Sequence, residues 1–80
     1  MPYITATARK IIDEGGIICT SGELNYAFTQ VIKRYIFVHG KSYTQFNDVI
    51  GALEGAKLEF YRRVIAPYED QKIISNGDVY

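Results

Sequence analysis

The sequence has few of the residues that usually stabilise or activate a small protein. Its 80 residues include one cysteine, one histidine and no tryptophan. A single cysteine excludes a disulfide within the chain, and a single histidine without paired ligand spacing argues against a zinc site. No nucleophile, base and oxyanion hole can be assembled from the motifs present. We therefore expect no catalytic residues, no metal and no cofactor, and a protein that is not an enzyme.

The sequence also lacks an excess of charge of either sign. Nine Lys and Arg balance nine Asp and Glu, so the formal net charge is zero. Such a chain has no general attraction to nucleic acid or to an anionic membrane. Neither a basic, apolar leader nor an apolar run of membrane-spanning length is present. These absences predict a cytoplasmic protein with no nucleic-acid or membrane partner.

A chain of this length has a marginal core. It buries only about 60–65% of the surface that its unfolded form exposes. We expect a single domain over residues 1–80, and oligomerisation is the remaining way to stabilise it. Cys19 follows Ile17 and Ile18, so we expect a buried, inert thiol.

The first half of the chain predicts two helices. A short one runs over about residues 5–14 and ends at Gly15-Gly16, because glycine readily adopts the positive φ of a helix C-terminus. The second runs over about 22–39, after the capping-box pattern Thr20-Ser21-Gly22-Glu23 and before Gly40. Its apolar residues follow helical spacing: Leu24, Ala27, Phe28, Val31, Ile32, Tyr35 and Val38.

The second half predicts the longest helix, over about residues 43–66. A second capping-box pattern, Ser42-Tyr43-Thr44-Gln45, opens it. One side carries an apolar stripe, which Leu58, Tyr61 and Ile65 widen: Phe46, Val49, Ile50, Leu53, Phe60 and Val64. The short link after Gly40 favours an antiparallel helical hairpin, and Pro67 should kink the helix or restart it.

The tail after Pro67 contains Asn76-Gly77, a strong signal for a two-residue β-turn. We therefore expect a C-terminal turn or a small β-hairpin. The fold predicted from the sequence is mainly α, an antiparallel helical hairpin with a short N-terminal helix, and oligomeric.

The longest predicted helix contains a pair of glycines four residues apart. Glycine inside a helix costs about 1 kcal/mol relative to alanine, so the pair suggests a close contact with a second backbone. That backbone belongs either to the preceding helix of the same chain or to another subunit. The residues assigned to packing or oligomer contact are Gly51, Ala52, Gly55, Phe46 and Leu53.

The densest polar cluster is Glu59-Phe60-Tyr61-Arg62-Arg63, with Lys57 just before it. Arginine forks suit phosphate or carboxylate, and a neighbouring tyrosine can stack on a base. The alternative is a solvated helix face with ion pairs, such as Glu59 with Arg63 and Glu54 with Lys57.

Other polar residues allow similar pairs of interpretations. Asn25 and Tyr26 lie near a helix N-terminus, which favours anions, or they are simple helix surface. Glu69 and Asp70 follow Pro67 and are better explained by first-turn capping than by acid–base chemistry. His39 is best explained as a cap near a helix C-terminus.

Three strings resemble a family of small uncharacterised proteins of bacteriophages and prophages. They are Gly22 to Tyr26, Leu53 to Arg63, and Ala66 to Asp70 continued by Asn76 to Tyr80. The resemblance covers about residues 20–80 and implies the host cytoplasm as the location. By analogy of size and helical character, it points to viral sponges of the anti-Thoeris and anti-CBASS kind, which sequester nucleotide signals without cleaving them.

The leading functional hypothesis is such a homo-oligomeric sponge. It would bind a cyclic nucleotide or an ADP-ribose-derived signal in pockets shared between subunits. The candidate ligand-binding residues are Arg62, Arg63, Lys57, Tyr61, Asn25, Tyr26, Tyr68 and Asn76. The alternatives are a homo-oligomeric interaction module that binds a host or phage protein, and a minor virion or assembly component.

Overall fold

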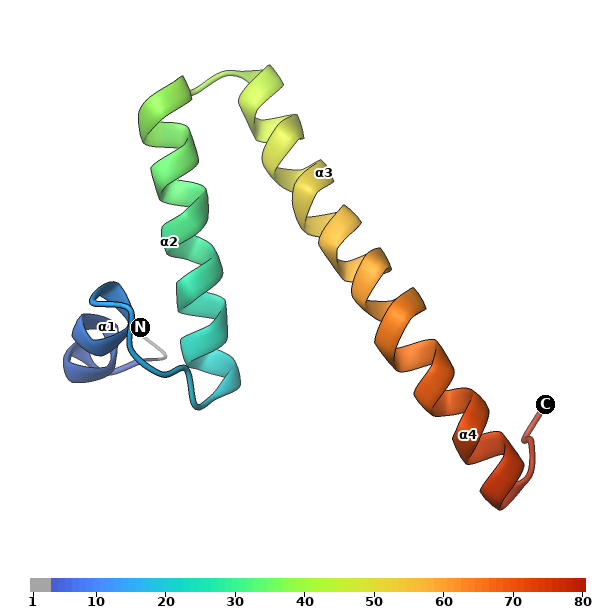
Figure 1. Cartoon of the computed structure of the whole chain (residues 1–80). Helices are drawn as coiled ribbons and strands as arrows, with labels where there is room; N and C mark the ends of the chain where they lie inside the picture. Colours follow the sequence, from blue (N-terminus) through green and yellow to red (C-terminus); the bar gives the residue numbers. More distant parts are fainter. Residues whose placement is uncertain (1–3) are drawn as a thin grey trace. The chain divides into compact units, whose positions relative to one another are not determined.

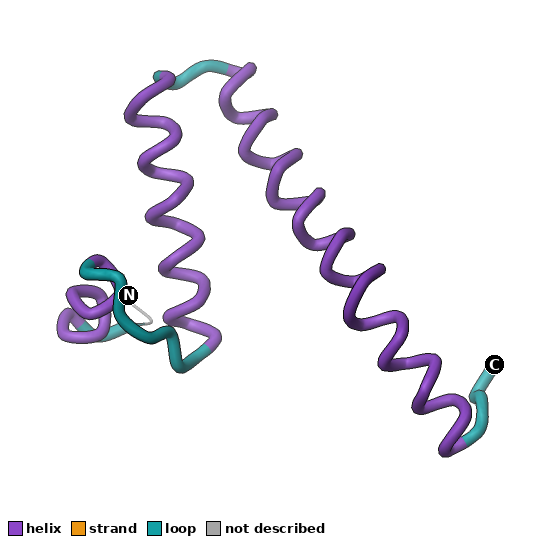
Figure 2. Tube along the Cα trace, in the orientation of Figure 1, coloured by secondary structure: helices purple, strands orange, loops and turns teal. Residues whose placement is uncertain are grey.

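The computed structural model describes residues 4–80, and these residues are mainly helical (Figure 1). The elements are α1 (Ala6–Asp13), α2 (Ser21–His39), α3 (Tyr43–Phe60), the π-helical turn η1 (Tyr61–Ile65) and α4 (Ala66–Asn76). No strand occurs over residues 4–80 (Figure 2). The chain divides into two compact units, residues up to 45 and residues 46–80. The predicted mainly α class is confirmed, and the antiparallel pairing of the long helices stays a prediction.

Helix α1 begins and ends as its sequence predicts. The Thr5 hydroxyl accepts a hydrogen bond from the Ala8 N–H at 3.1 Å, which caps the first turn. At the other end Gly15 has φ of +82°, and the N–H groups of Gly15 and Gly16 donate to the carbonyls of Ile12 and Ile11. This pair of bonds is the Schellman motif.

Helix α2 confirms the first capping box and its predicted bounds to within one residue. The Thr20 hydroxyl accepts from the Glu23 N–H at 3.1 Å, and the Glu23 carboxylate accepts from the Cys19 N–H at 3.0 Å. The reciprocal bond therefore falls one residue earlier than in the usual box. Gly40, at φ +88°, ends the helix, and its N–H donates to the Ile36 carbonyl.

The helix that begins at Tyr43 continues past Phe60 through a change of geometry. At its start the Ser42 hydroxyl donates to the side-chain oxygen of Gln45, a contact between side chains that differs from the backbone bonds of the predicted capping box. In η1 the N–H of Ala66 reaches back five residues to the Tyr61 carbonyl. Pro67 has no N–H for the Arg63 carbonyl, and its ring would crowd that carbonyl in a regular helix. The predicted change before Pro67 is thus a π-turn followed by α4.

The predicted C-terminal turn or β-hairpin is wrong, because the chain is helical to Asn76. A type I′ turn needs positive φ at both central residues. Only Gly77 has it, at +86°, and no non-glycine residue does so over the described part of the chain. Gly77 instead ends α4, and its N–H donates to the Ile73 carbonyl at 2.8 Å.

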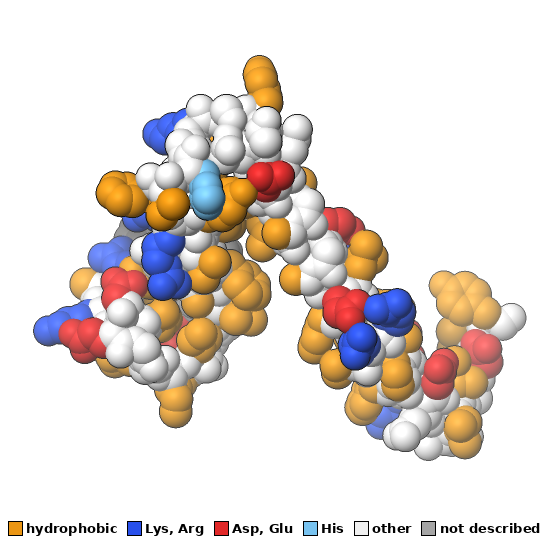
Figure 3. Space-filling view, turned by 45° about the horizontal axis from the view of Figure 1, so that its top comes forward, with side chains coloured by type: hydrophobic (Ala, Val, Ile, Leu, Met, Phe, Trp, Pro, Cys, Tyr) orange, Lys and Arg blue, Asp and Glu red, His pale blue; other side chains and the backbone are white. Residues whose placement is uncertain are grey.

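Over the described residues 4–80, neither unit encloses a hydrophobic core. Of the residues that the structure describes, none is buried, and 21 large apolar side chains are exposed. Figure 3 shows apolar side chains along the surface of the helical run in the 46–80 unit. Cys19 is exposed as well, which corrects the expectation of a buried thiol, because the loop before α2 has no core to enter. The described residues therefore fit the marginal core expected for a chain of this length.

Candidate functional site

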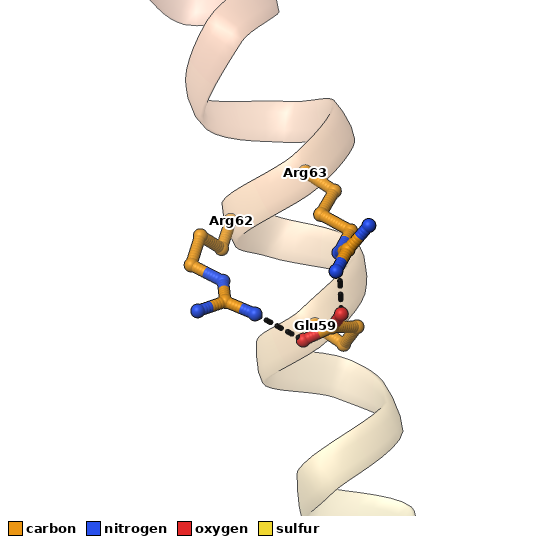
Figure 4. Close-up of polar contacts among 3 residues, drawn as sticks. All are labelled: Glu59, Arg62 and Arg63. Atoms are coloured by element: carbon orange, nitrogen blue, oxygen red, sulfur yellow. Dashed lines mark hydrogen bonds and ion pairs between the residues drawn. The ribbon is translucent and has the colours of Figure 1, made fainter.

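The strongest polar cluster lies at the junction of α3 and η1, where two arginines share one carboxylate. Arg62 Nη2 lies 2.5 Å from Glu59 Oε2, and Arg63 Nε bonds the other oxygen, Oε1. Figure 4 shows the two side chains reaching Glu59 from different positions on the ribbon. Both arginine side chains are 71% exposed. The cluster therefore carries one net positive charge at the surface, and its two guanidinium groups have further N–H donors that Glu59 does not use.

Lys57 belongs to a separate pair. Its Nζ lies 3.5 Å from Glu54 Oε1, one helical turn earlier. The ion pairs expected from spacing, Glu54 with Lys57 and Glu59 with Arg63, are thus confirmed. Because exposed pairs of this kind contribute only about 0–1 kcal/mol, an incoming anion could displace them at small cost.

The π-turn brings Tyr61 to Glu69. Eight residues of α-helix turn about 80° past two full turns, so positions eight apart normally lie on different faces. A π-turn rotates less per residue and reduces this offset. The Tyr61 hydroxyl donates to the Glu69 carboxylate, and this bond with the nearby negative charge raises the pKa of Tyr61. Glu69 lies in the first turn of α4, as predicted, but α4 continues directly from η1 with no side-chain cap bond, so the carboxylate pairs with Tyr61 instead.

Tyr68 also has a partner within its own helix. Lys72 Nζ lies 5.3 Å from the centre of the Tyr68 ring, in reach of a cation–π interaction. Asn76 ends α4 and is exposed. These two predicted ligand residues lie on the same unit as Lys57, Tyr61, Arg62 and Arg63.

Asn25 and Tyr26 lie on the other unit. The Tyr26 hydroxyl lies 2.8 Å from both oxygens of the Asp13 carboxylate, which ties α2 to α1. The Asn25 carbonyl accepts from the Thr29 hydroxyl at 3.0 Å, and its side chain is on the helix surface. The His39 ring lies tilted against the Tyr35 ring, with centroids 4.4 Å apart, in the last turn of α2, the position expected for it.

The residues assigned to packing occupy two sides of α3. A Cβ built at Gly51 or Gly55 would meet no atom within 4 Å. The two glycines follow Phe46 and Ile50 by five residues, which places them about 140° around the helix from the apolar stripe. Ala52, Phe46 and Leu53 are exposed. Contact of these residues with another subunit stays a prediction.

A hollow in the first unit was not foreseen from the sequence. It has a volume of about 400 Å³ and lies between α1, the loop after it, and α2. Its lining combines apolar side chains with polar ones: Ile12, Ile18, Ala27, Val31, Asp13, Gln30 and Arg34, with Gly15 and Gly16. No sequence signal could have found it, since it depends on how α1 contacts α2.

Residues 4–80 hold neither a metal-binding cluster nor a membrane-spanning helix. No three His, Cys, Asp or Glu side chains in this part of the chain are arranged to hold a metal ion. No helix of the described residues has both the length and the apolar character needed to cross a membrane.

Comparison with known proteins gives one match. No curated protein and no solved structure matches the chain. One family model, described as a domain of unknown function (DUF6899), matches residues 1–79. Because that model spans nearly the whole sequence, the chain belongs to the DUF6899 family.

Proposed function

We propose that this chain is a non-enzymatic binding protein that works as a homo-oligomer. The observation that carries the proposal is the absence of any buried residue over residues 4–80. Helices with exposed apolar stripes are unstable alone in water and gain most of their stability from packing. A second copy supplies such packing from the same sequence.

Thermal unfolding at several protein concentrations tests this proposal. If folding requires association, the midpoint rises with concentration, by several degrees over a hundredfold range. A midpoint that is constant over that range, for a chain that stays helical, contradicts the proposal.

A second candidate function is the capture of an anionic nucleotide-type signal, such as a cyclic nucleotide or an ADP-ribose derivative. The exposed cluster of Arg62 and Arg63 on Glu59 favours it, because its net positive charge and free N–H donors suit a phosphate. In a bacteriophage this capture would counter a host defence signal. Phe60 and Tyr61 directly precede the two arginines in sequence, and Tyr68 follows them by five residues.

A thermal-shift panel of these nucleotides tests the second function. We expect one of them to raise the midpoint of the wild-type protein and to be recovered intact after denaturation. Arg62→Ala and Arg63→Ala should each abolish that shift, while Arg9→Ala, a matched change in the other unit, should keep it. No shift with any nucleotide would exclude this function and leave the homo-oligomer proposal untouched.

A further inference from the structure

The long helical run extends beyond the reach of α2. α2 has 19 residues and is about 28 Å long, whereas the run from Tyr43 to Asn76 is about 50 Å long. Even a full antiparallel hairpin could cover the run only to about Tyr61. The apolar residues that follow need a different partner.

The apolar residues at this limit and just beyond it form a set, here called the distal patch: Phe60, Tyr61, Val64, Ile65 and Tyr68. Phe60, Val64 and Tyr68 follow one another at intervals of four residues and are 56%, 54% and 60% exposed. A row of large apolar side chains at helical spacing is the usual contact surface between two packed helices.

The charges around the distal patch are ordered in a way that suits a second copy of the same helix. In the sequence, Glu54 and Lys57 come before the patch, and Glu69 and Lys72 come after it. In each pair the acidic residue comes three positions before the basic one, and the two pairs are placed symmetrically about position 63. In an antiparallel pair of identical helices centred there, Lys57 faces Glu69 of the second copy and Glu54 faces its Lys72.

We infer that two copies of this chain pack antiparallel through the distal patch, with Val64 near the two-fold axis; the inference rests on the proposed self-association. Each apolar row covers the other, and two symmetric sets of opposite charges fix the register. Arg62 lies two residues before Val64 and so points to another face of the helix. Arg62 therefore lies outside this interface, and Arg63, at the centre of the register, keeps its ion pair with Glu59.

Charge reversal in the full-length chain tests the register. Lys57→Glu or Glu69→Lys places like charges opposite each other twice, so each should weaken dimerisation by roughly tenfold or more. The double variant, and an equimolar mixture of the two single variants, should restore association. Glu69→Lys alone also removes the bond from Tyr61, but the double variant lacks that bond too, so restoration cannot come from it.

Native mass spectrometry and sedimentation, with circular dichroism to check helicity, give the readouts. Val64→Asp should raise the dissociation constant more than about a hundredfold, because it buries a charge at the centre of the patch. The matched changes Val79→Asp and Lys41→Glu should leave it unchanged. An oligomeric wild type that none of the distal-patch variants weakens overturns this inference alone, and a monomeric wild type overturns the proposed self-association as well.

Discussion

In the folded chain Tyr61 contacts Glu69, eight residues later in the sequence, and this contact shifts the pKa of the Tyr61 phenol. Its hydroxyl donates to Glu69, and this hydrogen bond and the carboxylate charge raise the pKa of Tyr61 above its ordinary value of about 10. The folded chain therefore holds the phenol proton more tightly than the unfolded chain does. The stabilising effect is complete below about pH 10 and is lost as the pH rises through the folded-state pKa.

We predict that Glu69→Gln lowers the pKa of Tyr61 toward its ordinary value. The glutamine keeps a hydrogen-bond acceptor but removes the negative charge that disfavours the phenolate. Ultraviolet titration of each protein, with Tyr61→Phe subtracted to isolate the one ring, measures the change. An identical titration of Tyr61 with and without the Glu69 carboxylate would contradict the contact.

Part of the polar site could be predicted from residue spacing. The pairs of Glu54 with Lys57 and of Glu59 with Arg63 follow from helical neighbours three and four positions apart. The hydrogen bond from Tyr61 to Glu69 could not be predicted, because two residues eight positions apart share a helix face only when a π-turn lies between them. The bond from Tyr26 to Asp13 also depends on a contact between two helices, which periodicity does not give.

Among the elements, α3 carries two glycines at a cost to its stability. Neither Gly51 nor Gly55 has a positive φ, and a Cβ at either position meets open space. We predict that Gly55→Ala raises the free energy of unfolding by about 0.5–1 kcal/mol, because alanine loses less backbone freedom in a helix. Urea unfolding at one fixed protein concentration measures this.

Gly16 offers the matched control for that change. A Cβ at Gly16 would lie 2.5 Å from the Ile11 side chain, so Gly16→Ala should destabilise the Schellman turn. If Gly55→Ala also destabilises the protein or lowers its mass in solution, a second backbone contacts the glycine pair, as the sequence first suggested.

The helix ends show what local sequence can and cannot determine. Thr20, Gly15 and Gly40 mark boundaries that the structure confirms, because a cap needs only a few neighbouring residues. Asn76-Gly77 suggested a hairpin, yet one glycine with positive φ serves a helix end equally well. The choice depended on whether helix persisted after Pro67, and η1 allows it to persist.

In the molecule as a whole, many large apolar side chains are exposed, and none of the described residues is buried. The stripe on α3 and the distal patch are both exposed, and no side chain over residues 4–80 is fully enclosed. The apolar helix stripes and the marginal core of an 80-residue chain favoured such exposure, with oligomerisation as the way to cover it. Which surfaces two copies share could not be predicted from composition, because it depends on helix length and charge order.

Sedimentation equilibrium of the wild-type protein tests the central claim of self-association most directly. Self-association predicts a mass at least twice the 9.1 kDa of one chain at micromolar concentration, together with a helical circular dichroism spectrum. A helical, cooperatively unfolding species with a mass of 9.1 kDa at every concentration would contradict it.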